Sequence, residues 1–186
     1  MDFDAINYSK NFEKAEFGER ALKKHLRNKK ILCLSTKLTS SEKTLGNFTN
    51  SEVNYISVPL LINACNDGIA DEILKIICDE YFSCEDFSEY DLIFLASSGL
   101  HLKKDFFKKY FDDKGNNIEI FSNTDAILED YDYKKENYIR DYFYVTLSKK
   151  GFYSRAEKYL REKKVLKDGE ILNVSQLKKD NKKSPK

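Results

Sequence analysis

The chain has 186 residues, of which 41% are hydrophobic and 34% are charged, with a formal net charge of +1. This length and composition suit a folded domain with a buried core and exclude global disorder. No apolar run approaches the ~20 residues that cross a bilayer, and the opening MDFDAINYSK lacks the apolar segment of a secretion signal. We therefore expect a soluble, cytoplasmic protein with no membrane partner.

The charge is unevenly distributed along the chain. Residues 63–136 hold 18 acidic and 8 basic side chains, whereas residues 137–186 hold 14 basic and 6 acidic ones. The basic end could face an anionic partner or the acidic middle segment, but two solvated surfaces are the simpler interpretation.

The first predicted elements are a helix and a strand. Residues 9–28 have apolar side chains at helical spacing, including Leu22 and Leu26, with His25 at the edge of that face. The run KKILCLST, residues 29–36, fits a buried strand.

The next segment is predicted as a loop followed by a strand. Residues 35–52 are polar and rich in Ser and Thr, which favours a loop, with room for a helical turn around Ser41–Leu45. Residues 53–62 favour a second strand, and Pro59 belongs near its end or at a sheet edge because proline has no amide hydrogen.

Two further strand and helix units follow. The turn at residues 66–68 precedes a predicted helix over residues 69–81. The segment YDLIFLASS, residues 90–98, is the strongest strand pattern, and a helix with a lysine face follows it. In the helix predicted over residues 69–81, one apolar face is formed by Ile69, Ile73, Ile76, Ile77 and Tyr81.

The remaining patterns are two strands, a basic helix and a turn. Residues 117–123 and 141–148 fit strands, and residues 154–166 fit a basic helix. Asp168-Gly169 would turn a candidate hairpin. Residues 175–186 read as a charged, mobile tail.

Strands that alternate with helices predict an α/β fold with a mainly parallel sheet covered on both faces. We expect one three-layer domain over residues 1–174, Rossmann-like or flavodoxin-like, that ends in the basic helix and the candidate hairpin. No internal repeat or sharp composition change argues for a second domain.

Hydroxyl side chains gather where three of the predicted strands end. Open α/β sheets bind ligands outside the carboxyl ends of their strands, so these side chains are expected to meet at one edge if the strands are parallel neighbours. They form the candidate ligand site. Its members are Ser35, Thr36, Ser97, Ser98, Gly99, Ser122 and Thr124.

The Ser-Ser-Gly turn carries most of this hypothesis. Gly99 would allow a sharp bend with positive φ, and Ser98 would cap the helix that follows. The amides of the first helical turn could then hold a phosphate or a carboxylate. The alternative is that the same residues only turn the chain and cap the helix.

Several familiar kinds of site are not indicated. The four cysteines form no C-x-x-C pair, so neither a zinc site nor a disulfide framework is expected. The glycine-rich nucleotide loops and the G-x-S-x-G elbow are absent. His101 could transfer protons but has no carboxylate partner near it in the sequence. The sequence names no cofactor and no metal.

The order of these elements resembles sugar-phosphate isomerase domains, with DLIFLASSG and a later Ser/Asn/Thr strand end as the shared features. That resemblance implies a phosphosugar ligand at the strand ends. The serine-x-serine-glycine-threonine pattern of such domains is not met, since Ala96 replaces the first serine and Leu100 follows Gly99. The segments SVPLL and YDLIFLASSG are also similar to one half of uroporphyrinogen-III synthases, but the second half is missing. No family is assigned.

Two functions remain open at this point. The first is binding of a small phosphorylated or carboxylated ligand at the strand ends. The second is a non-enzymatic interaction module, in which Arg155, Lys158 and Arg161 contact nucleic acid or a protein partner.

Overall fold

The computed structural model describes residues 18–115, 117–130, 142–145 and 170–173. The chain divides into two compact units, Met1–Tyr133 and Lys134–Lys186. We call them the first and the second unit and describe each by itself. Across the described ranges, no helix combines the length and the apolar character that spanning a bilayer would require.

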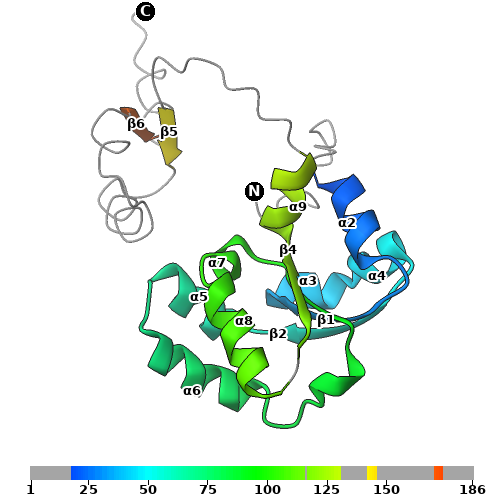
Figure 1. The fold of residues 1–186 in the computed structure, drawn as a ribbon. Helices are drawn as coiled ribbons and strands as arrows, with labels where there is room; N and C mark the ends of the chain where they lie inside the picture. The colour runs from blue at the N-terminus through cyan, green and yellow to red at the C-terminus, as the bar shows by residue number, and fades with distance from the viewer. Residues whose placement is uncertain (1–17, 116, 131–141, 146–169, 174–186) are drawn as a thin grey trace, which may run out of the picture. The chain divides into compact units, whose positions relative to one another are not determined.

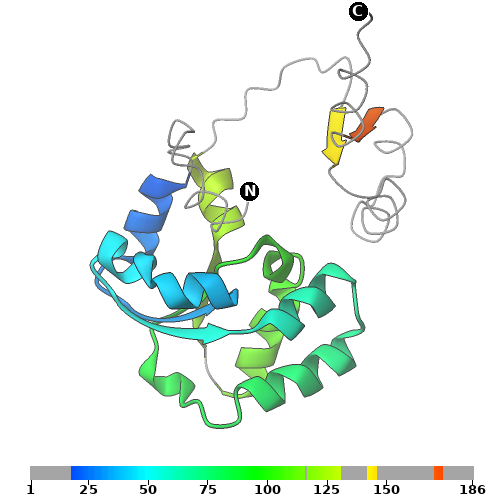
Figure 2. The same cartoon turned by 180° about the vertical axis from the view of Figure 1, so that it is seen from behind.

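A parallel sheet of four strands forms the centre of the first unit (Figure 1). Its strands are β1 (Lys30–Ser35), β2 (Glu52–Ser57), β3 (Leu92–Leu95) and β4 (Glu119–Ser122), in the order β2-β1-β3-β4. Figure 1 views the sheet from its β4 edge and Figure 2 from its β2 edge. This confirms the predicted α/β class, and the order matches the flavodoxin-like alternative.

Helices cover both faces of the sheet, because alternate strand side chains point to opposite sides. Leu32 and Leu34 belong to one buried cluster, and Ile31 and Cys33 belong to the other. The first cluster is covered by α5 (Pro59–Asn66), α6 (Asp71–Tyr81) and α8 (Lys104–Asp113). The second is covered by α2 (Glu19–Leu26), α4 (Thr44–Thr49) and α9 (Asn123–Asp130).

The segment predicted as a loop forms two short helices, α3 (Lys37–Glu42) and α4. Thr36 is the N-cap of α3, where its side chain accepts a hydrogen bond from the Thr39 amide. Leu45 of α4 is fully buried. The loop prediction was wrong because capping and one buried leucine hold these helices, which show little helical periodicity in the sequence.

The strand predicted over residues 53–62 ends at Ser57, and its second half is α5. Pro59 is the first residue of that helix. At this position proline stabilises a helix, because its fixed φ suits the first turn and its missing amide hydrogen would have no partner there. Pro59 does lie close to the end of β2, which is an edge strand.

The buried face of α6 differs from the predicted one. Ile73 and Ile76 are 51% and 68% exposed, whereas Leu74 and Cys78 are fully buried. Leu74 and Cys78 are four residues apart and therefore lie on the same side of the helix. A segment with so many apolar residues offers two helical faces, and packing against the sheet selects one of them.

The helix predicted after β3 is divided into α7 (Ser98–His101) and α8, with a turn at residues 102–103. A short 3₁₀ helix, η1 (Phe87–Glu89), precedes β3. Both short helices connect larger elements of the first unit.

The second unit contains β5 (Tyr142–Val145) and β6 (Glu170–Asn173), which pair in parallel in a separate two-stranded sheet. The strand predicted over residues 141–148 is therefore present but does not join the first sheet. The basic helix, the turn at Asp168-Gly169 and the charged tail lie outside the described residues.

Candidate functional site

The carboxyl ends of β1, β3 and β4 lie at one edge of the sheet. The three strands are consecutive in the sheet order and all run parallel. The structure thus meets the condition under which the predicted hydroxyl groups converge. The chain also reverses its direction of strand addition between β1 and β3, which is where open α/β sheets form a ligand crevice.

We call the residues at these three strand ends the strand-end rim. They are Ser35, Thr36, Ser97, Ser98, Gly99, Ser122, Asn123 and Thr124.

Ser35 and Thr36 have local structural roles. Ser35 is fully buried, and its Oγ lies 2.8 Å from Ser40 Oγ. Ser40 Oγ in turn donates to the Thr36 carbonyl at 3.0 Å, and Thr36 caps α3. These hydrogen bonds fix the chain after β1.

The turn after β3 differs from its predicted geometry. Ser97, and not Ser98, is the N-cap residue of α7, and Ser98 is the first residue of the helix. The Ser97 side chain makes no capping hydrogen bond to α7, although the residue is only 4% exposed. Its hydroxyl is therefore a polar group at the sheet edge that has no role in capping.

Gly99 is a helical residue of α7, so the predicted bend with positive φ is wrong. Its lack of a side chain matters for another reason. A Cβ at this position would lie 2.6 Å from Asn66 Oδ1, at the end of α5. Glycine here lets α7 approach α5 closely.

Ser122 and Asp125 form a reciprocal cap at the start of α9. Ser122 Oγ accepts from the Asp125 amide at 3.1 Å, and Asp125 Oδ2 accepts from the Ser122 amide at 2.9 Å. This exchange satisfies two backbone donors that would otherwise be unpaired. It also fixes the Asp125 carboxylate beside the end of β4.

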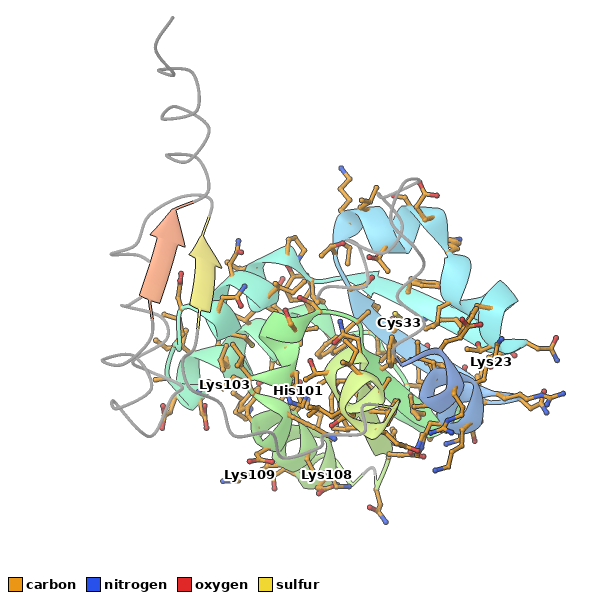
Figure 3. The ribbon with its side chains drawn as sticks, turned by 90° about the horizontal axis from the view of Figure 1, so that it is seen from above. Lys23, Cys33, His101, Lys103, Lys108 and Lys109 are labelled. Carbon is orange, nitrogen blue, oxygen red and sulfur yellow. The ribbon has the colours of Figure 1, made fainter. Side chains whose placement is uncertain are left out.

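His101 and Lys104 extend this cap into a polar cluster. His101 Nδ1 lies 2.8 Å from Ser122 Oγ, and Ser122 Oγ donates to Asp125 Oδ2 at 2.7 Å. Lys104 Nζ donates to the same carboxylate oxygen at 2.8 Å. Figure 3 shows His101 beside α9, at the end of α7. Residues from α7, α8, β4 and α9 thus meet at one place.

The hydrogen bonds determine which ring nitrogen of His101 carries the proton. Ser122 has one hydroxyl hydrogen, and a charged carboxylate is the stronger acceptor for it. Ser122 therefore accepts from His101, and we assign the proton of the neutral ring to Nδ1. Nε2 is left with its lone pair, as in a ring that can accept a proton.

Burial and charge act on both ionisable partners. Burial lowers the pKa of His101, Asp125 opposes this, and Lys104 adds to it. Burial alone would raise the pKa of Asp125, but hydrogen bonds from Lys104 and Ser122 outweigh it and hold that pKa below its ordinary value. Both shifts favour an uncharged ring and an ionised carboxylate near neutral pH.

Asn123 carries the unsatisfied group of the rim. The residue is 4% exposed, and its Nδ2 is buried without a hydrogen-bond partner among the described residues. Its Oδ1 accepts from Thr124 Oγ1 at 3.4 Å. Buried amide donors without a partner are rare in folded proteins and each destabilises the fold by about 1–3 kcal/mol.

Sequence reasoning located the edge, and its predicted rim over residues 122–125 includes Asn123 and Asp125. It did not predict that His101 and Lys104 lie beside Asp125. The spacing Ser-x-x-Asp at a strand end could have indicated the cap of α9. Nothing in the sequence indicates that Asn123 is buried or that His101 reaches Ser122.

A groove between α6 and α8 has a volume of about 390 Å³. Phe106 and Tyr110 line it together with charged side chains of both signs. Lys75 and Lys114, two of those side chains, form ion pairs with Asp79. This mixed, internally paired surface favours no ligand class. In the described part of the chain, no group of His, Cys, Asp and Glu side chains is arranged to hold a metal ion.

Comparisons with known proteins give a fold but no family. No family model and no curated protein sequence matches the chain. Among solved structures, the glutamate racemase isoform RacE1 from Bacillus anthracis superposes with a TM-score of 0.64 at 18% identity. The match covers 84% of this chain and 61% of the racemase chain, so this chain spans about three fifths of that protein. The likeness supports the α/β fold alone.

Proposed function

We propose that the strand-end rim of the first unit binds a small carboxylated or phosphorylated ligand. The observation that carries this proposal is the buried Nδ2 of Asn123, a donor without a partner at the end of β4. An anionic oxygen placed beside it would supply the missing acceptor.

Ser97 would provide a second donor. Leu95 of β3 pairs in register with Ser122 of β4, so Ser97 and Asn123 follow the ends of two neighbouring strands. Such strands lie about 4.8 Å apart, and we expect both side chains to contact one small anion. Ser98 and Thr124, which are half-buried, would line the edge of the same site.

Glutamate is the first ligand to test. The racemase with a similar fold acts on glutamate, a small molecule with two carboxylates. Inorganic phosphate and a sugar phosphate would test the phosphorylated class. The proposal concerns binding and names no reaction.

The second function considered from the sequence was an interaction module for nucleic acid or a protein. Arg155, Lys158 and Arg161, on which it depends, lie outside the described residues. No observation in the first unit favours it.

Asn123→Leu provides the sharpest test of the proposed function. Leucine has a similar volume and no donor, so the substitution removes the unsatisfied amide. We expect the ligand-free variant to melt at the same temperature as the wild type or higher. At a glutamate concentration about 100-fold above its Kd, the free energy of unfolding of the wild type should rise by about 2.7 kcal/mol. Its melting temperature should rise by several degrees. The variant should lose most of this gain.

Asn63→Leu is the matched control, because Asn63 lies exposed on α5. It should keep the ligand-dependent gain. Two results would contradict the proposal. One is the absence of a melting shift with glutamate, phosphate and sugar phosphate alike, and the other is an equal shift in wild type and Asn123→Leu.

A further inference from the structure

The charges in and around the polar cluster, beside the strand-end rim, balance one another before any ligand binds. Lys104 and Asp125 form an ion pair at 2.8 Å. The neighbouring Lys103 pairs with Asp71 at 2.7 Å. With a neutral His101, the polar cluster therefore has no excess positive charge, and an anionic ligand would add unbalanced negative charge.

His101 is the group that can restore the balance. Its side chain is 26% exposed, and Nδ1 is engaged with Ser122. Nε2 is the ring nitrogen available to accept a proton. The ring lies within a chain of hydrogen bonds that ends at the Asp125 carboxylate, and this arrangement stabilises an imidazolium.

We infer that binding of an anionic ligand at the rim is coupled to uptake of a proton by Nε2 of His101. This inference rests on the proposed function and adds a specific residue and a regulation by pH. It assigns to His101 a role in affinity that the sequence did not indicate.

The sign of the coupling follows from the charged groups that face the ring. Burial and Lys104 of α8 favour the neutral ring, whereas Asp125 of α9 and Asp105 of α8 favour the charged one. A bound anion joins the second group and raises the pKa of His101. The ligand should therefore bind more tightly as pH falls through the pKa of the complex, and the extra affinity should disappear as pH rises above it.

Titration calorimetry with glutamate tests the coupling, because glutamate has no group that titrates near neutral pH. For the full-length wild type we expect Kd to fall by about tenfold between about pH 8 and about pH 6. In buffers of different ionisation enthalpy, the apparent binding enthalpy should show net proton uptake. His101→Asn keeps an amide donor for Ser122 but cannot ionise. Its Kd should change less than about twofold over the same range, without proton uptake.

His25 is the second of the two histidines in the sequence and supplies the control. Its Nε2 lies 2.7 Å from Glu129, which is not a member of the polar cluster. His25→Gln should retain the full pH dependence. Equal pH dependence in wild type and His101→Asn would overturn the inference while leaving the proposed function intact. An absence of binding at every pH for glutamate, phosphate and sugar phosphate alike would overturn both.

Discussion

Replacing Leu74 with alanine is expected to lower the free energy of unfolding by about 2–5 kcal/mol. Leu74 is fully buried between α6 and the sheet. The substitution removes apolar contacts and leaves a cavity that close-packed neighbours fill only in part. Chemical denaturation of the full chain, followed by far-UV circular dichroism, would measure the loss.

Ile76→Ala is the matched control on the same helix. Ile76 is largely exposed, so its truncation should change the free energy of unfolding by no more than about 0.5 kcal/mol. A larger loss for Ile76→Ala than for Leu74→Ala would show that α6 is rotated relative to the sheet, as the isoleucine pattern in the sequence suggests.

Asp125→Asn is expected to destabilise the protein by about 1–3 kcal/mol near neutral pH. The substitution removes the charged acceptor that holds Lys104 and the Ser122 amide. In the variant, the free energy of unfolding should also vary less with pH in the acidic range. The pKa of Asp125 is lower in the folded protein than its ordinary value of 3.8, so its stabilisation is present above that value and is lost as pH falls through the folded pKa.

Denaturation at about pH 7 and at about pH 2 would measure both effects. The difference in free energy of unfolding between the wild type and Asp125→Asn should be largest at neutral pH and should decrease in acid. Asp105→Asn is the control, because Asp105 is exposed on the first turn of α8. It should change stability by less than about 0.5 kcal/mol. If this difference in free energy of unfolding stays constant with pH, the charge of Asp125 does not stabilise the cap, which would contradict the account.

The sheet could be predicted from the sequence because its central strands are unambiguous. β1 and β3 are short apolar runs bounded by polar and turn residues, a pattern typical of buried parallel strands. The helices α3 and α5 could not be predicted in the same way. A Thr cap holds α3, and α5 continues an apolar run whose conformation changes at Pro59.

The location of the candidate site could also be predicted, but its chemistry could not. Because β1, β3 and β4 are parallel, their carboxyl ends lie at one edge of the sheet, whatever contacts the side chains there make. Which hydroxyl groups are already engaged depends on local hydrogen bonds, such as the cap between Ser122 and Asp125. The contact between His101 and Ser122 joins residues 21 positions apart, and helical or strand periodicity carries no signal for it.

A crystal structure of the protein with glutamate tests the central claim most directly. The proposed function predicts a carboxylate oxygen about 2.7–3.2 Å from Asn123 Nδ2, with Ser97 Oγ donating to the same carboxylate. His101 should remain bonded to Ser122 beside it. Glutamate bound elsewhere, with Asn123 Nδ2 donating to an oxygen of the protein itself, would show that the strand-end rim is a structural feature and not a binding site.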